Sequence, residues 1–145
     1  MLLEEEGIHF IGNKRNTPKI DTKQWGIEQI ICRKPHACKI MTLYPGYAVS
    51  FHWHREKTES FLLIEGELIV ELIDQWGKPS TIHLTKPYSS VTIEKNMPHT
   101  FYCPEDQEGN TVFIEASTTD SPDDSYRIYP SGPRGQNSIN RRSID

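Results

Sequence analysis

Short runs of alternating apolar and polar residues fill the chain between residues 25 and 118, and they constrain the fold more than any other feature. The clearest run, residues 67–73 (ELIVELI), ends at the sequence DQWGKP, which is typical of a hairpin connection. Period-two alternation places successive side chains on opposite faces of a strand, and the 3.6-residue period of an amphipathic helix is hard to find here. We therefore expect an all-β domain.

The runs are separated by turns that contain Gly, Pro and Asn. They cover residues 25–32, 37–44, 47–54, 60–64, 67–73, 81–84, 90–94, 100–103 and 111–117. Many short strands at intervals of about 8 to 12 residues predict a β-sandwich or a small barrel. We place the barrel at residues 23–128, after an extended lead-in at residues 1–22 and before a flexible polar tail at residues 129–145.

Composition limits the classes of partner. The chain has 145 residues, of which 35% are hydrophobic and 25% charged, and this suits one soluble globular domain. A formal net charge of -4 argues against binding to nucleic acid or to an anionic membrane, and no apolar run is long enough for a membrane-spanning helix. Cys32, Cys38 and Cys103 are odd in number and widely spaced, so we expect no disulfide framework and a cytoplasmic location.

Two of the histidines, His52 and His54, lie one residue apart in the segment FHWHREKTES. In a strand their side chains would share a face about 6.6 Å apart, close enough for both imidazoles to bind one metal ion. Glu59 follows a short bend and could return its carboxylate to the same point. His99 begins a later run that antiparallel pairing could bring across to the pair. The alternative is a pair of histidines on an exposed, polar strand face.

The spacing of these residues resembles the first motif of the cupin superfamily, G-x5-H-x-H-x3,4-E-x6-G. Every fixed position of that motif is present: Gly46, His52, His54, Glu59 and Gly66. The second cupin motif is matched only in part, because His99 is present while Glu94 replaces a proline and Cys103 an asparagine. Asn96 stands in place of a glycine, and asparagine tolerates the positive φ that such a turn requires.

This resemblance implies a double-stranded β-helix, the cupin jelly-roll barrel, in which His52, His54, Glu59 and His99 are metal ligands. Three imidazoles and a carboxylate suit a divalent ion of Mn, Zn, Fe, Co or Ni, and the sequence does not choose among them. Single-domain cupins often pair through the N-terminal strand or the outer sheet. The resemblance therefore also implies a homodimer.

A narrower resemblance is carried by residues 23–26 (KQWG), by Ser50 and by residues 113–127 (FIEASTTDSPDDSYR), which look like the cupin-type mannose-6-phosphate isomerases. The longer loop before Glu59, with Lys57 inside it, is more similar to the D-lyxose isomerase group of cupins. Together these resemblances imply an aldose–ketose isomerase that acts on a sugar or sugar phosphate through a metal-stabilised enediolate.

Three residues are candidates for the proton transfer and substrate binding of such a reaction. Glu115 lies in an otherwise apolar run and could be the base. Lys57, close to a cation and partly desolvated, would have a lowered pKa and is the other candidate base. Arg127, oriented by Asp124, could hold a hydroxyl or phosphate oxygen. The structural alternatives are a solvated loop lysine, a solvent-facing glutamate and a surface ion-pair cluster that includes Asp123.

Two other functions remain open from the sequence. Three histidines with open coordination positions also suit an iron-dependent oxygenase. A small cupin can also bind a metal ion and a carbohydrate without catalysis. We interpret Trp25 as packing, His83 as structural and Cys103 as a buried, inert thiol, although alternation places Cys103 on the face of His99.

Overall fold

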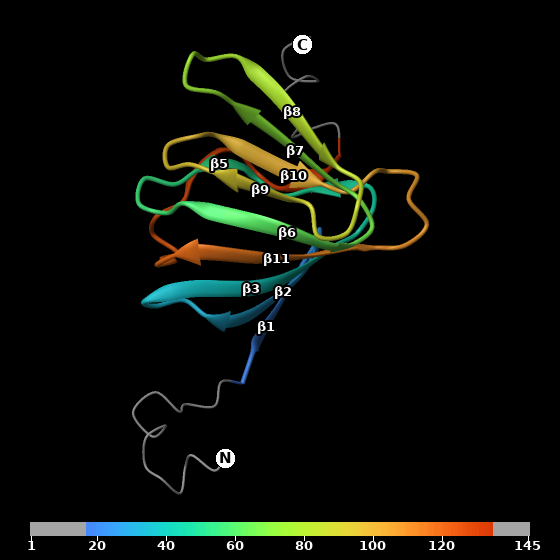
Figure 1. Cartoon of the computed structure of the whole chain (residues 1–145), viewed down its shortest axis with the longest axis horizontal. Helices are drawn as coiled ribbons and strands as arrows, with labels where there is room; N and C mark the ends of the chain where they lie inside the picture. Colours follow the sequence, from blue (N-terminus) through green and yellow to red (C-terminus); the bar gives the residue numbers. More distant parts are fainter. Residues whose placement is uncertain (1–16, 135–145) are drawn as a thin grey trace, which may run out of the picture.

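A computed structural model describes residues 17–134, which form two antiparallel sheets packed face to face (Figure 1). The strands are β1 (Lys19–Lys23), β2 (Gly26–Cys32), β3 (His36–Leu43), β4 (Tyr47–Ala48), β5 (Phe51–Trp53), β6 (Glu59–Glu65), β7 (Leu68–Ile73), β8 (Pro79–Leu84), β9 (Ser90–Ile93), β10 (His99–Tyr102), β11 (Thr111–Thr118), β12 (Tyr126–Tyr129) and β13 (Gly132–Pro133). The prediction of an all-β domain is confirmed. In the part of the chain that the structure describes, no helix has the length and apolar character needed to cross a membrane.

The order of strands places neighbouring segments of the chain in different sheets. The larger sheet has the order β1-β2-β3-β11-β6-β9, and the smaller has the order β12-β5-β10-β7-β8. A short ribbon of β4 and β13 is separate from both. The chain therefore crosses repeatedly between the sheets, and this brings side chains of β5, β6, β10 and β11 to the lining of one pocket.

The alternation of the sequence locates most of the strands, with two kinds of difference. Residues 47–54 form two strands rather than one, because the chain leaves the ladder at Val49, whose N–H donates to Phe101 O at 3.3 Å. Strands β1, β12 and β13 were not predicted, and their exposed side chains explain the weak signal. β1 lies mostly within the segment 1–22 and β13 within 129–145. The rest of those two segments, residues 1–16 and 135–145, lies outside the described residues.

Aromatic side chains from both sheets form the centre of the core. Phe61, Phe101 and Phe113 have ring centroids 4.8 to 5.4 Å apart, and all three side chains are buried. Full burial of each such side chain contributes about 1.5 to 3 kcal/mol relative to its exposure. Phe101 also lines the pocket described below, so this aromatic cluster contributes an apolar side chain to the pocket surface.

Gly26 fixes the position of Trp25 at the start of β2. The φ of Gly26 is 155°, and a Cβ at this position would lie 1.8 Å from Thr42 O, so no other residue fits without displacing the backbone. Trp25 is buried in the core cluster, which confirms the packing interpretation, and its ring also lines the pocket.

Candidate metal centre

Three imidazoles meet on the inner face of the smaller sheet. His52 lies in β5 and His54 follows that strand directly, so alternation points both side chains inward. β10 pairs antiparallel with β5 in a register that places His99 opposite His52. The ring centroid of His52 is 4.8 Å from that of His54 and 4.6 Å from that of His99. The predicted convergence of the three histidines is confirmed.

Two local features place the remaining groups. Asn96 has a φ of 65° in the turn before β10, as its substitution for glycine predicted, and its N–H donates to His54 O at 2.6 Å. The bend before β6 is held by Asp124, whose carboxylate accepts hydrogen bonds from the N–H groups of Arg55 and Glu56. This bend turns the chain so that Glu59, the first residue of β6, faces the imidazoles.

Each of the three histidines is oriented by a backbone carbonyl. The Nδ1 atom of His52 lies 2.8 Å from Ser50 O, that of His54 lies 2.6 Å from Asp124 O, and that of His99 lies 2.9 Å from Met97 O. A carbonyl oxygen can only accept, so each Nδ1 carries a proton, and a ring in its neutral form keeps its lone pair on Nε2. Backbone or carboxylate acceptors on the far nitrogen are the usual partners of metal-binding imidazoles.

The ligand atoms converge on one point. One possible ligand atom from each of His52, His54, Glu59 and His99 lies within 4.8 Å of every other. Glu59 Oε2 lies 2.9 Å from His99 Nε2 and 3.4 Å from His54 Nε2. These three buried atoms nevertheless have no hydrogen bond of acceptable geometry within residues 17–134. Buried polar atoms rarely lack a partner, so this donor set fits a divalent metal ion, and the cluster could hold one.

The charges of the cluster also suit a cation. Burial opposes ionisation of Glu59, but its contacts with His54 and His99 outweigh burial and hold the pKa of this carboxyl well below its usual range. Burial, together with His99 and His54, lowers the pKa of His52 well below its usual value. Burial also disfavours the charged form of His54, but Glu59 raises its pKa overall. The site therefore presents an ionised carboxylate and a neutral His52 imidazole.

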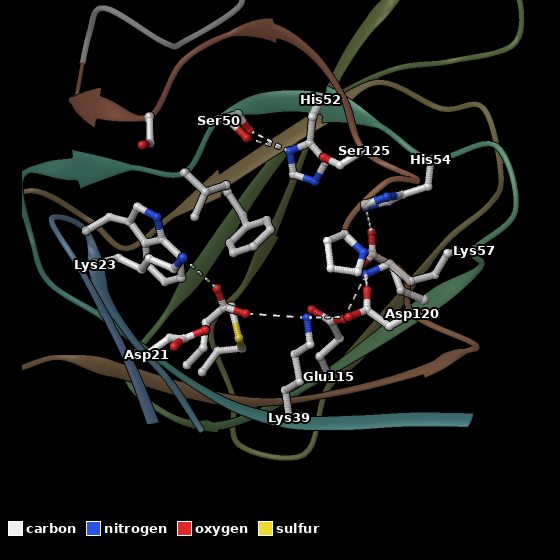
Figure 2. A pocket seen from close by; sticks show the side chains of 18 of the residues that line it. Asp21, Lys23, Lys39, Ser50, His52, His54, Lys57, Glu115, Asp120 and Ser125 are labelled. Carbon is white, nitrogen blue, oxygen red and sulfur yellow. Dashed lines mark hydrogen bonds and ion pairs between the residues drawn. The ribbon is translucent and has the colours of Figure 1, made fainter. Parts of the chain in front are cut away.

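A second group of charged side chains faces the imidazoles from the other side of the pocket (Figure 2). Lys57 Nζ donates to Glu115 Oε2 at 3.1 Å and to Asp120 Oδ1 at 3.0 Å, and it lies 3.5 Å from Glu59 Oε1. Lys57 and Glu115 are each only 4% exposed, which excludes the alternatives of a solvated loop lysine and a solvent-facing glutamate. Lys57 thus connects the metal cluster to the buried carboxylate that the sequence singled out.

The two candidate bases differ in protonation. Burial lowers the pKa of Lys57, but Glu115, Glu59 and Asp120 outweigh it and raise the pKa well above its ordinary value. The expectation that Lys57 has a lowered pKa is therefore wrong. Three carboxylates surround its ammonium group, and their attraction more than offsets the effect of desolvation. Burial, and then the charge of Glu59, raises the pKa of Glu115. Glu59 and Glu115 are thus pushed in opposite directions, a pattern typical of carboxylates with different roles.

The ionic group extends through residues that the sequence did not single out. Asp120 Oδ2 lies 2.9 Å from Arg33 Nη1 and 3.2 Å from Lys39 Nζ. Lys39 Nζ is in turn 3.4 Å from Glu28 Oε1. No short motif connects these positions. The one available signal was Lys39, a charged residue at an inward position of the alternating run at residues 37–44.

The side chains of the ionic group, together with His52, His54 and Glu59, line one cavity of about 330 Å³. Arg127 lies in β12 directly across from His52 and also lines the cavity. Asp124 does not orient Arg127 as expected, since the Asp124 carboxylate accepts hydrogen bonds from the bend before β6.

Cys103 is buried against Leu43 O, 3.7 Å from its Sγ, and does not line this cavity. His83 pairs with Glu67 at 2.7 Å on the surface, as a structural residue would.

Comparison with known proteins identifies the fold. No family model matches the chain, and no curated protein matches it. Among solved structures, the capsular polysaccharide assembling protein CapF from Staphylococcus aureus covers 81% of the chain at 16% identity with a TM-score of 0.70. Oxalate decarboxylase from Bacillus subtilis covers 77% at 17% identity with a TM-score of 0.67, and that from Lactobacillus farciminis covers 77% at 17% with 0.66.

These identities are low enough that the likeness concerns the fold alone. The chain spans only about a third of the length of the matched structures, namely 33% of CapF and 30% and 34% of the two decarboxylases. The matched proteins are cupin-fold proteins, and the all-β architecture of this chain agrees with that fold. The protein therefore has the cupin fold, a double-stranded β-helix with a potential metal centre in its interior.

Proposed function

We propose that the protein is a metal-dependent aldose–ketose isomerase that acts on a sugar or a sugar phosphate. The observation that carries the proposal is the pair of buried carboxylates beside the histidines. Glu59 is held ionised among the imidazoles, whereas the pKa of Glu115 is raised toward the range of a general base. A pocket that only binds a metal ion has no need of the second carboxylate.

The roles of the residues follow from their positions. His52, His54, Glu59 and His99 would hold a divalent ion of Mn, Zn, Fe, Co or Ni. When bound, such an ion supplies a Lewis acid for two adjacent substrate oxygens. The remaining chemistry, the movement of one proton between neighbouring carbon atoms, falls to the protein's own side chains.

Glu115 is the proposed base. Its Oε2 accepts a hydrogen bond from Lys57 Nζ at 3.1 Å, which leaves Oε1 as the oxygen that this contact does not engage. We assign Oε1 as the atom that takes the proton from the substrate C–H bond, whose electron pair passes into the enediolate, and then returns that proton to the adjacent carbon. Lys57 stays protonated because of the carboxylates around it, so it positions Glu115 and stabilises negative charge rather than acting as a base.

The test is solvent exchange followed by NMR. The purified protein, supplied with Mn²⁺, Zn²⁺, Fe²⁺, Co²⁺ or Ni²⁺, is incubated in D₂O with pentoses, hexoses and their phosphates. We expect deuterium at the carbon next to the carbonyl and the appearance of the ketose. Glu115→Gln should lower this rate by about 10² to 10⁴-fold, while Glu67→Gln, a matched change of an exposed glutamate outside the pocket, should not.

A defined result contradicts the proposal. If no substrate in the panel exchanges although the ion is bound, the isomerase function is wrong. Oxygen uptake by the Fe²⁺-loaded protein would then favour an oxygenase. Carbohydrate binding without turnover would instead favour a non-catalytic binding protein.

The homodimer predicted from the resemblance remains a prediction. Light scattering after gel filtration should give twice the 16.8 kDa of the chain. A mass equal to that of one chain would contradict it.

A further inference from the structure

The pocket is lined by equal numbers of acidic and basic side chains. Its carboxylates are Asp21, Glu28, Glu59, Glu115 and Asp120, and its cationic groups are Lys23, Arg33, Lys39, Lys57 and Arg127. The protein therefore brings no net charge to this space when all ten groups are ionised. A divalent ion on the histidine cluster would leave the pocket with two uncompensated positive charges.

Four of the five basic side chains are already paired with carboxylates. Lys57 and Arg33 are within hydrogen-bonding distance of Asp120, as described above. Lys39 lies between Asp120 and Glu28. Lys23 Nζ lies 3.8 Å from the same glutamate, at Oε2. These cations are not available to a ligand unless an existing ion pair breaks.

Arg127 is the exception. It is exposed, and its guanidinium has no ion pair or hydrogen bond within residues 17–134, yet it lines the pocket from the strand next to His52. Ser125, two residues earlier in the chain, lies beside His52 and His54 in Figure 2 and offers a hydroxyl on the same side of the pocket. A guanidinium with a nearby hydroxyl is a recognised arrangement for a carboxylate or a phosphate group.

We propose that the substrate carries an anionic group, a carboxylate or a phosphate ester, and that Arg127 binds it while Ser125 assists. The excess positive charge of a metal-loaded pocket and the free guanidinium both favour a negatively charged ligand. This inference rests on the proposed function because it places the reacting part of the substrate at the histidine cluster. It narrows the substrate class from sugars in general to acidic sugars and sugar phosphates.

The test measures binding without turnover. Polyols cannot be isomerised, so sorbitol, gluconate and sorbitol 6-phosphate form a set that differs mainly in charge. Isothermal titration of the purified protein with each compound, in the presence of Mn²⁺ and about 0.15 M NaCl, should show at least one of the two anions binding about tenfold more tightly than sorbitol. The anion that shows this preference distinguishes a carboxylate from a phosphate.

Matched arginine variants show which guanidinium is responsible. Arg127→Gln should reduce the ratio of the anion affinity to the sorbitol affinity to near one. Arg55→Gln should leave this ratio unchanged, since the Arg55 guanidinium lies over the Tyr126 ring and does not line the pocket. Equal affinity for all three polyols, absence of binding by both anions at millimolar concentration, or an unchanged preference in Arg127→Gln would overturn the inference.

The outcome is separable from that of the proposed function. An anion preference that depends on Arg127, without proton exchange in any sugar, would contradict the isomerase and keep the anion site. Proton exchange in neutral sugars, with no preference for the charged compounds, would support the isomerase and contradict the anion site.

Discussion

The two walls of the pocket are built in different ways. On the smaller sheet, His52 and His99 come from adjacent strands and His54 directly follows the first of them. The imidazoles of His52 and His99 are held by carbonyls two residues away, and that of His54 by the carbonyl of Asp124. On the other wall, Lys57 and Asp120 hold each other across 63 residues of sequence. The spacing of the three imidazoles depends mainly on strand alternation and one register. The second wall instead consists of ion pairs, and those of Lys57 and Asp120 join segments that are far apart in the sequence.

This difference has an energetic consequence. The His52 imidazole is a neutral polar group, so its removal leaves no buried charge without compensation. The second wall, which we call the ionic wall, consists of Lys57, Glu115, Asp120, Arg33 and Lys39. Their charges lie in or near the interior and offset one another. Loss of one partner there leaves a buried charge without compensation, which is far more costly than loss of the whole pair. We therefore expect substitutions on the two walls to separate stability from metal binding.

The largest effect should come from the ionic wall. Lys57→Met leaves the carboxylates of Glu115 and Asp120 without their shared cation, and we expect the free energy of unfolding at pH 7 to fall by about 3 to 5 kcal/mol. Denaturant titration of the metal-free protein measures this change. The double variant Lys57→Met with Glu115→Gln should recover part of the loss, since one of the orphaned charges is then gone.

The control for this prediction is another lysine. Lys86 is exposed in the turn before β9, so Lys86→Met should change the free energy of unfolding by less than about 0.5 kcal/mol. Equal effects of the two substitutions would show that the ionic wall does not stabilise the fold.

The histidine wall should give the opposite pattern. His52→Ala should change the stability of the metal-free protein by less than about 1.5 kcal/mol. It should remove the stabilisation by Mn²⁺, which in the wild type reaches about 2.7 kcal/mol when the free ion is at 100 times its Kd. Thermal unfolding with and without the ion measures both quantities. If the ion stabilises the variant as much as the wild type, His52 is not a ligand.

The smallest of these effects concerns the turn that delivers His99. Asn96 adopts a φ of 65°, so Asn96→Ala should cost about 1 kcal/mol of stability, because a Cβ without a compensating polar group is disfavoured in this conformation. Asn96→Gly should be within about 0.5 kcal/mol of the wild type. Denaturant titration of the two variants distinguishes them. Equal losses would show that the positive φ is not what selects the residue.

The same difference between the walls explains how much could be predicted from the sequence. The alternation of His52 and His54 and the turn at Asn96 are local properties, so the histidine cluster and the cupin fold were predictable. Glu115 was visible only as a charge in an apolar run. Partial desolvation of Lys57 was expected, but its nearly complete burial among three carboxylates was not, because it depends on the packing of the other sheet. Asp120 lies in a polar segment, where nothing distinguishes it from its neighbours until the fold brings three cations to it.

The central claim, that four residues from three segments of the chain bind one divalent ion, can be tested by metal titration. Isothermal titration of the chelator-treated protein with Co²⁺ should give one ion per chain. The affinity should fall by about 100-fold or more in both His99→Ala and Glu59→Gln, since even changes to the partners of ligands cost about 10 to 100-fold. His83→Ala should bind as the wild type does. An absence of binding, or an affinity unchanged by loss of His99 and Glu59, would contradict the account.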